Sequence, residues 1–481
     1  MALAIIGSQR VDSESRFKVY NPSTGEVLEE VPKLPLERVR EAIEVAYNAQ
    51  EVLQSTPASS RASSLMRAAE MIRARAEELA RTMSSEVGRP IRSARVEISR
   101  TAQIFELAAS EVRNVLSGSY VPLEVYDFPA GNERRFAMIR REPVGVVGSI
   151  TPFNFPAASF AHKVAPALAV GNTVVHKPSS LAPLTQIKLA EILLGSGFPP
   201  GSVNVITGDS ELIGEEFVRN DRISLITFTG SEAVGLQLAS RAVAQGKRVI
   251  MELGGMDPMI VLEDADVGRA VQAALVGRFD YAGQFCNATK RIMVREEVAG
   301  KFEEELVSRL SSMRVGDALD EGTDVGPLIS PSAVKAMGEF VLDATSSGGE
   351  LVFQGRVPER GFFYPPTVLR LRGELGIRAL REEVFGPVLP VIRVKDDEEA
   401  VRLANSTKYG LDAAIFSGDF NRAYRLACRI KAGTVMINDT TRLRWDNLPF
   451  GGFKRSGIGR ESVRDTMLEM TESKVIVNNF G

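Results

Sequence analysis

Three short segments carry residue types that together could act on a carbonyl group. Cys286, one of two cysteines in the 481-residue sequence, ends a glycine-containing segment, Phe279-Asp-Tyr-Ala-Gly-Gln-Phe-Cys286, that is expected to form a loop. A thiol on a short loop can reach a substrate, and a nearby base or amide dipole can favour its thiolate. Two other segments, Thr151-Pro-Phe-Asn-Phe-Pro156 and Met251-Glu-Leu-Gly-Gly255, supply an amide and a carboxylate. This combination points to catalysis on a carbonyl.

Each of these residues also has a more ordinary interpretation. A lone cysteine such as Cys286 is often a small buried hydrophobe. Glu252 ends an apolar strand segment, where an unpartnered carboxylate is costly and its pKa is driven upward, as suits a general base. It could equally be a salt-bridged residue at a strand end. Asn154, at a strand-to-helix junction, could donate its amide to an oxyanion or could cap the helix. The residues alone leave these alternatives open.

The two histidines and the second cysteine are weaker candidates for a catalytic or metal-binding role. His162 and His176 are the two histidines of the sequence, and neither has the spacing of a metal ligand, so no metal site is predicted. A core or surface role is expected for both. Cys428 falls in an apparent helix over residues 422–430 and is expected to be structural.

A possible phosphate site follows the expected strand at residues 223–228. There a glycine turn, Gly230-Ser231, leads into a helix whose free N–H groups and positive dipole end suit a phosphate. The turn is not the G-x-G-x-x-G fingerprint of dinucleotide sites, and Ser231 could simply cap the helix. Lys177, at the carboxyl end of another strand, is either a solvated charge or a contact to a ribose or phosphate.

Alternating apolar strands and helices from residue 144 onward predict the fold class. Helices are expected at 157–170 and 183–194, between strands, and this alternation implies an α/β fold with a parallel, doubly wound, Rossmann-like sheet and right-handed crossovers. A second α/β series is expected from about residue 257 to 432. The expected strands of the two series are 144–150, 173–176, 203–206, 223–228, 258–261, 290–295, 387–392 and 413–416.

The flanking segments have a different character. Amphipathic helices are expected within 35–92 and at 96–116. The turn-rich segment 120–141, with a strand candidate at 136–139, is expected to be a hairpin that leaves the main body. A short apolar strand at 474–477 is expected to pair with its own domain or with a neighbouring subunit.

Bulk composition narrows the class of protein. A chain of 481 residues is too long for one ordinary core, so two large domains are expected. With 44% hydrophobic and 25% charged residues and a net charge of −3, the sequence is typical of a globular protein and gives no electrostatic reason to expect nucleic acid or an anionic membrane as partner. No signal sequence, membrane-spanning run or disulfide framework is recognisable, so a cytoplasmic location is expected.

Seven segments resemble motifs of the aldehyde dehydrogenase superfamily, in the family's order and over nearly the whole chain. The segment Asn438-Asp-Thr-Thr-Arg442 and the Asp-Asn before Pro449 also look like archaeal lactaldehyde and glyceraldehyde dehydrogenases. Any single motif could arise by chance, whereas seven in order could hardly do so. The seven segments are Thr151–Pro156, His176–Ser179, Phe228–Ser231, Met251–Gly255, Gly283–Cys286, Glu382–Pro387 and Pro449–Lys454.

The resemblance implies a mechanism for the first three residues. Cys286, as thiolate, attacks the aldehyde to give a thiohemiacetal, whose oxyanion is held by the Asn154 amide and the Cys286 backbone N–H. Its collapse delivers hydride to the nicotinamide and leaves a thioester. Glu252 then activates the water that hydrolyses this thioester to the acid.

The resemblance also implies a set of cofactor contacts. The position of Glu383 contacts the nicotinamide ribose, and Phe385 packs near that ring. Lys177 touches the adenosine ribose or its phosphate, and Gly230 and Ser231 lie at the pyrophosphate. The other positions implied for the cofactor are Thr151, Phe153, Ser179, Ser180 and Leu253.

Two positions depart from the pattern of many relatives. Ser180 stands where many NAD-preferring members have a glutamate that binds the ribose hydroxyls. Without that carboxylate a 2′-phosphate is not repelled, and a serine can donate to it, so NADP is expected to be accepted and preferred over NAD. Phe153 replaces a tryptophan and keeps an aromatic wall.

The segment at 438–449 is expected to form part of the substrate funnel. Arg442, Arg444 and His162, with Phe155 as an apolar wall, could bind a hydroxyl or carboxylate on a short aldehyde, or the arginines could be solvated rim charges. A funnel with this many polar groups argues against long apolar aldehydes as substrates. Glyceraldehyde, lactaldehyde and succinate semialdehyde all stay candidate substrates.

Three rival functions fit the sequence less well than oxidation of an aldehyde followed by hydrolysis of the thioester. A CoA-acylating enzyme does not need the base Glu252. A non-catalytic paralogue is disfavoured because Cys286, Glu252 and Asn154 are all present. A cofactor-free cysteine hydrolase is disfavoured by the turn at Gly230 and by the lack of a well-placed histidine partner.

The resemblance finally implies a division of the chain and a homo-oligomer, either a dimer or a homotetramer. The cofactor domain is expected at 1–119 and 142–252, the catalytic domain at 253–435, the β extension for oligomerisation at 120–141 and 466–481, and the return segment lining the funnel at 436–465.

Overall fold

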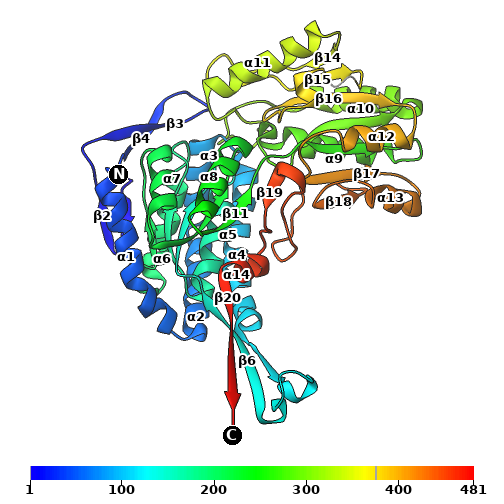
Figure 1. Ribbon diagram of the computed structural model, residues 1–481. Coiled ribbons are helices and arrows are strands. Elements are labelled where there is room, and N and C mark those ends of the chain that lie inside the picture. The colour runs from blue at the N-terminus through cyan, green and yellow to red at the C-terminus, as the bar shows by residue number, and fades with distance from the viewer. Residues whose placement is uncertain (1, 374–375, 481) are drawn as a thin grey trace.

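The computed structural model describes residues 2–373 and 376–480 and has two large, mainly parallel sheets with helices packed on them (Figure 1). In the first sheet the parallel strands run in the order β9-β8-β7-β10-β11, with antiparallel edge strands beyond them. The strands of this sheet are β1 (Ala4–Ile6), β2 (Gln9–Val11), β7 (Val146–Ile150), β8 (Thr173–Lys177), β9 (Val203–Val205), β10 (Ile223–Thr229), β11 (Arg248–Glu252) and β19 (Gly457–Ile458).

Helices bury both faces of the first sheet, which explains why its strands are continuous apolar runs rather than alternating ones. Val174 packs into a core with α2–α6, whereas its neighbour Val175 packs into a second core with α1, α7 and α8. The helices of this half are α1 (Leu36–Ser55), α2 (Ala58–Ala74), α3 (Ala76–Val87), α4 (Ile91–Leu116), α5 (Pro156–Val170), α6 (Leu184–Gly195), α7 (Ser210–Arg219), α8 (Glu232–Ala244) and α14 (Val463–Glu469).

The second sheet follows strand β11 of the first sheet closely along the chain: Glu252 ends β11 and Asp257 begins β12. Its order is β14-β15-β16-β13-β12-β17-β18, parallel except for the edge strand β14. The strands are β12 (Asp257–Val261), β13 (Thr289–Arg295), β14 (Glu350–Gln354), β15 (Thr367–Leu371), β16 (Val388–Val394), β17 (Asp412–Phe416) and β18 (Thr434–Ile437). The helices are α9 (Val267–Phe279), α10 (Glu296–Ser311), α11 (Pro331–Ser346), α12 (Asp397–Ala404) and α13 (Phe420–Ala427).

A third sheet forms an arm that leaves the body, as Figure 1 shows in cyan and red. It consists of β5 (Ser119–Pro122), β6 (Arg135–Pro143) and β20 (Thr471–Asn479), in the antiparallel order β20-β6-β5. The terminal strand therefore pairs with its own chain, over the whole length of β6. The remaining elements are the hairpin β3 (Arg16–Tyr20) and β4 (Val27–Pro32), and short 3-10 helices at Leu123–Val125, Asn132–Arg134, Asp280–Gly283, Arg378–Leu380 and Lys454–Ser456.

The α/β fold class and most of the expected elements are confirmed, with shifts of a few residues at their ends. One expectation was wrong: helix α13 ends at Ala427 instead of continuing to Ile430, so Cys428 follows the helix and is exposed rather than structural. Within the described part of the chain, no helix has the length and apolarity required to cross a bilayer.

Candidate active site

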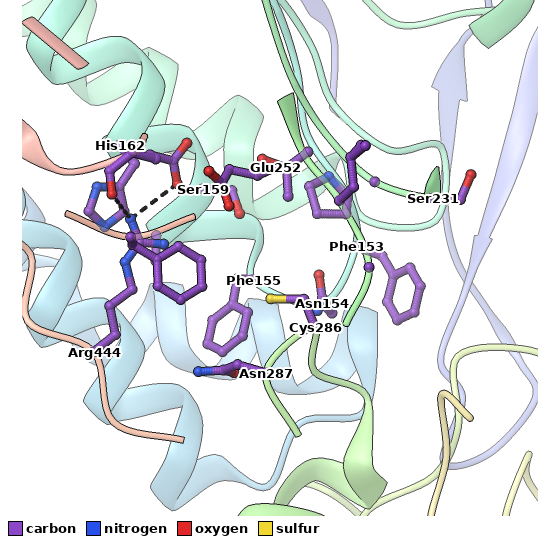
Figure 2. Close-up of a pocket in the computed structure, with 18 of the residues that line it drawn as sticks. Phe153, Asn154, Phe155, Ser159, His162, Ser231, Glu252, Cys286, Asn287 and Arg444 are labelled. Carbon is purple, nitrogen blue, oxygen red and sulfur yellow. Dashed lines mark hydrogen bonds and ion pairs between the residues drawn. The ribbon is translucent and has the colours of Figure 1, made fainter. Parts of the chain in front are cut away.

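A cavity of about 310 Å³ lies where the carboxyl end of the first sheet faces the amino end of the second. Figure 2 shows Cys286, Asn154 and Glu252 in its middle, with Phe153 and Ser231 towards one end. The predicted residues that line it are Phe153, Asn154, Phe155, His162, Gly230, Ser231, Glu252, Leu253, Cys286, Glu383, Phe385, Arg442 and Arg444. The predicted residues outside its lining are Thr151, Lys177, Ser179 and Ser180.

Cys286 lies in the loop between α9 and β13, directly after an unusual turn. Tyr281, Ala282 and Gly283 have φ angles of 48°, 53° and 71°, so three successive residues are left-handed. For a residue other than glycine this conformation costs roughly 1–2 kcal/mol, and surrounding contacts must hold it. Burial raises the pKa of the Cys286 thiol to about 12, although the nearby Lys290 ammonium opposes the shift. The resting group is therefore the neutral thiol, which needs a base before it can attack.

Asn154 follows β7 and faces the loop that carries Cys286. Its Nδ2 donates to the backbone oxygen of Gln284 at 3.0 Å, two residues before the thiol. The N-cap position of α5 belongs to Phe155, so Asn154 is not the helix cap. Its amide is thus held at the cavity wall beside the segment that carries Cys286, a position compatible with a donor to an oxyanion.

Glu252 ends β11 with only 3% of its surface exposed. Both carboxylate oxygens lack a hydrogen-bond partner among the described residues, so the salt-bridged alternative was wrong. Burial, reinforced by the negative charge of Glu461, raises its pKa well above the ordinary value, although Arg444 and Lys163 oppose this. A raised pKa makes the carboxylate a stronger base, as general-base catalysis at neutral pH requires.

A buried ionic network lies beyond Glu252, and sequence reasoning missed most of it. Lys163 Nζ is 2.7 Å and Arg444 is 3.2 Å from the carboxylate of Glu461. Burial opposes ionisation of Glu461, but these two cations outweigh it and lower its pKa. The signal available in the sequence was Lys163 itself, a charge within the otherwise apolar helix α5.

The predicted substrate residues are already engaged with protein groups. His162 Nε2 lies 2.8 Å from Asp446, and burial lowers its pKa to about 4, so the ring is neutral at physiological pH. Arg442 is 3.3 Å from Asp280 and stacks at 3.6 Å over Phe285. The arginines are therefore cavity-wall groups with 14–15% of their side chains exposed, not solvated rim charges.

The other end of the cavity lies at a topological switch point. Strands β8 and β9 lie on one side of β7, and strands β10 and β11 lie on its other side. Ligands bind at such a reversal of strand order in doubly wound sheets. Thr229 Oγ1, at the end of β10, is buried without a partner among the described groups. Ser231 holds the N-cap position of α8 but its side chain caps nothing, so the helix N-terminus stays available to an anion.

The predicted cofactor residues outside the cavity lie along the same sheet edge. Lys177 is 3% exposed and donates to Ser210 Oγ at 2.6 Å, so it is not a solvated charge. Burial lowers its pKa to about 8. Ser210 was missed, because an ordinary serine at a helix start carries no signal. Thr151 uses its hydroxyl internally, on Gln186 at 2.7 Å.

Ser179 and Ser180 follow Lys177 and are half-buried. Ser179 Oγ accepts from the backbone N–H of Leu181 at 3.2 Å. On the opposite wall Glu383 meets Lys290 at 3.2 Å and Phe385 packs edge-on against Phe153 at 6.0 Å. The two aromatic rings and this carboxylate fit the nicotinamide end of a dinucleotide.

Comparisons with known proteins show the family to which the chain belongs. The sequence pattern of the aldehyde dehydrogenase family matches residues 10–476. A lactaldehyde dehydrogenase from Methanocaldococcus jannaschii is 42% identical over 463 residues, which cover 95% of this chain and 96% of that protein. The mitochondrial succinate-semialdehyde dehydrogenase of Arabidopsis thaliana is 38% identical over 475 residues, or 98% of this chain and 88% of that protein.

A solved structure shares the fold over almost the whole chain. The crystal structure of glyceraldehyde-3-phosphate dehydrogenase GapN from Methanocaldococcus jannaschii, complexed with NADP, superposes with a TM-score of 0.91 at 41% identity. The superposed region covers 97% of this chain and 100% of the GapN chain. The chain belongs to the aldehyde dehydrogenase family, whose members are oxidoreductases that use NAD or NADP.

Proposed function

We propose that the enzyme oxidises a small polar aldehyde to its carboxylic acid, with Cys286 as nucleophile. The observation that carries the proposal is the meeting of Cys286, Asn154 and Glu252 around one buried cavity. The sulfur forms a bond to the aldehyde carbon, and the carbonyl oxygen becomes the oxyanion of a thiohemiacetal. The proposed donors to this oxygen are the Asn154 amide and the Cys286 backbone N–H.

Glu252 is the proposed base. Because Cys286 is neutral at rest, its proton must pass to solvent before the sulfur attacks. Once the thiohemiacetal has lost hydride and become a thioester, the unpartnered Glu252 carboxylate takes a proton from the water that attacks the thioester carbon. The departing Cys286 sulfur regains a proton as the acid is released. A base of this kind supports transfer of the acyl group to water rather than to CoA.

Bound NAD or NADP supplies the hydride acceptor of the reaction. At the switch point, Lys177, Ser179, Ser180 and Ser210 would hold the adenosine ribose, and Ser231 with the α8 N-terminus would hold the pyrophosphate. The nicotinamide end would lie against Phe153 and, on the opposite wall, Glu383 and Phe385. We propose that NADP is preferred, since no acidic side chain occupies position 180 to repel a 2′-phosphate.

The substrate end of the cavity favours a short aldehyde with polar groups. Arg444 and His162 line it there, with Phe155 as an apolar wall. We propose glyceraldehyde or lactaldehyde as the substrate type. Succinate semialdehyde is the second candidate, because Arg442 Nε is buried without a partner among the described residues and could bind a carboxylate.

The arm is the proposed oligomerisation surface. Val475, Ile476 and Val477 on β20 are 58%, 39% and 54% exposed, and β20 is the open edge of its sheet. An apolar open edge of this kind is expected to be covered, and a second copy of the chain would cover it in a homodimer or homotetramer. In the proposed division, the first sheet serves the cofactor and the second carries the nucleophile.

An absorbance assay at the reduced-nicotinamide band tests the proposed function. NADP and NAD are compared on glyceraldehyde, lactaldehyde and succinate semialdehyde, with Cys286→Ala as the inactive control. Reduction by the wild type and not by Cys286→Ala is the expected result. Activity that requires CoA, or equal activity of Cys286→Ala, would contradict the proposal.

A further inference from the structure

The left-handed turn before Cys286 is held by contacts from outside its own loop. Tyr281, the first residue of the turn, has no exposed surface, and its hydroxyl donates to the backbone oxygen of Val87 at 2.7 Å. Val87 is the last residue of α3, in the other half of the molecule. The conformation of the nucleophile segment therefore depends on a contact with the end of α3.

Arg89, two residues after Val87, lies between the nucleophile segment and the segment of Asn154. Its side chain is buried, and its guanidinium lies 4.4 Å from the ring centre of Phe155, 4.7 Å from that of Tyr281 and 5.4 Å from that of Phe285. One ring thus belongs to the Asn154 side and two belong to the Cys286 side. Cation–π contacts of this kind are strongest where water is excluded.

The same guanidinium also holds the backbone on the Asn154 side. Arg89 Nη2 donates to the backbone oxygen of Asn154 at 2.6 Å and lies 3.2 Å from Glu97. Glu97 in turn accepts from the backbone N–H groups of Ala157 and Ala158, at 3.0 and 3.1 Å, in the first turn of α5. A buried ion pair is weak evidence for stability, but here each member fixes the backbone next to the proposed oxyanion donor.

We propose that Arg89 is a positioning residue that sets the separation of the Asn154 amide and the Cys286 segment. It does so by clamping the two backbone segments, with Tyr281 as the contact on the nucleophile side. The inference rests on the proposed function, since it assumes that Asn154 and Cys286 act on the same carbonyl. A planar guanidinium can stack on aromatic rings and donate hydrogen bonds at the same time. A lysine ammonium cannot do both, so lysine cannot replace Arg89 fully.

Arg89→Lys tests the proposal in a Cys428→Ser background, where Cys286 is the sole thiol. We expect kcat to fall by about tenfold to a hundredfold, because a small misplacement of reacting groups costs this much, while KM for the aldehyde changes little. Alkylation of Cys286 by iodoacetamide should become faster, since a looser loop exposes and solvates the thiol. Turnover and thiol reactivity therefore move in opposite directions.

Arg61→Lys is the matched control. Arg61 is also buried and donates to the backbone oxygen of Ala169 at 2.9 Å, near the far end of α5. We expect this variant to lower the thermal unfolding midpoint and to leave kcat and the alkylation rate unchanged. An equal loss of kcat in Arg61→Lys would show that Arg89 acts only through stability, and would overturn the proposal.

Tyr281→Phe keeps the test decisive if Arg89→Lys does not fold. This variant retains the ring under Arg89 and loses only the hydroxyl, so we expect kcat to fall by about fivefold with little change in KM. Wild-type kcat in every folded variant of Arg89 and Tyr281, beside an inactive Cys286→Ala, would overturn the clamp alone. An active Cys286→Ala would instead overturn the function on which it rests.

Discussion

At the scale of single residues, the site combines two groups whose burial works against ionisation. The thiol of Cys286 and the carboxylate of Glu252 both have raised pKa values, because burial disfavours their charged forms. A thiol that stays neutral at rest is protected from oxidation, and a carboxylate with a raised pKa is a better base when it ionises. Both groups are therefore unreactive in the resting site, and each reacts only after it has lost its proton.

The pH dependence of turnover follows from Glu252. As an acid with a raised pKa it is protonated at low pH, so activity should rise with pH through a pKa well above the ordinary value of a glutamic acid. Glu252→Gln should lower kcat by at least about a hundredfold and remove this ascending limb. Initial rates from pH 5 to 9 check the result, and a Gln variant with an unchanged limb would assign the titration to another group.

Cofactor choice should depend on the side chain at position 180. Ser180→Glu places a carboxylate where we propose the 2′-phosphate of NADP, so the ratio of kcat/KM for NADP to that for NAD should fall by at least about tenfold. Ser347→Glu, at an exposed position after α11, is the control and should keep the wild-type ratio. A ratio that does not move in Ser180→Glu contradicts the proposed adenosine site.

At the scale of the elements, close approach between α8 and β11 shapes the cofactor end. A Cβ added at Gly235 would lie 2.2 Å from Leu253 and 3.0 Å from Phe228, so the helix packs directly on the sheet. This contact sets where the α8 N-terminus points, and with it the proposed pyrophosphate site.

Gly235→Ala should therefore push α8 away from the sheet. We expect a loss of about 1–3 kcal/mol in the free energy of unfolding and weaker binding of NADP. Gly338→Ala is the matched control, because its added Cβ would meet nothing within 4 Å and lies inside helix α11, where alanine is favoured. Urea unfolding and NADP titration separate the two variants, and equal behaviour would contradict the packing argument.

Elements were predictable because their signals are local. The run from Val144 to Ile150 and the strand at Ile223 are apolar without alternation, which indicates a strand buried on both faces. Asn154 and Cys286 could be singled out from motif spacing, and the structure places both on one cavity. The ionic roles of Glu461 and Asp446 could not be predicted. Their partners on α5, Lys163 and His162, are about 300 and 284 positions away in sequence.

Lys177 and Cys428 show the same limit. The sequence left open whether Lys177 is a solvated charge or a cofactor contact, and only the surrounding elements show that it is buried. Cys428 was expected to be structural within a helix over residues 422–430, but helix α13 ends at Ala427. Burial and helix ends are both decided by tertiary packing, which a single sequence does not contain.

At the scale of the whole molecule, the arm has an apolar strand edge that a single chain leaves exposed. Val475 and Val477 are more than half exposed on an open strand edge. Val475→Asp with Val477→Asp should convert the proposed oligomer to monomers without lowering the stability of one chain, because neither side chain is buried in that chain. Sedimentation velocity gives the mass. Leu342→Asp, at another exposed position on α11, is the control, and loss of assembly in both variants would contradict the assignment of the arm.

The proposed oxidation depends on a covalent intermediate that forms on Cys286. The most direct measurement is peptide mass spectrometry of the Glu252→Gln variant, acid-quenched during turnover of lactaldehyde or glyceraldehyde with NADP. Because this variant should form the thioester and hydrolyse it slowly, we predict an acyl adduct on the peptide that contains Cys286 and none on the peptide that contains Cys428. Turnover of the aldehyde without any adduct on Cys286, or an adduct on a different residue, would contradict it.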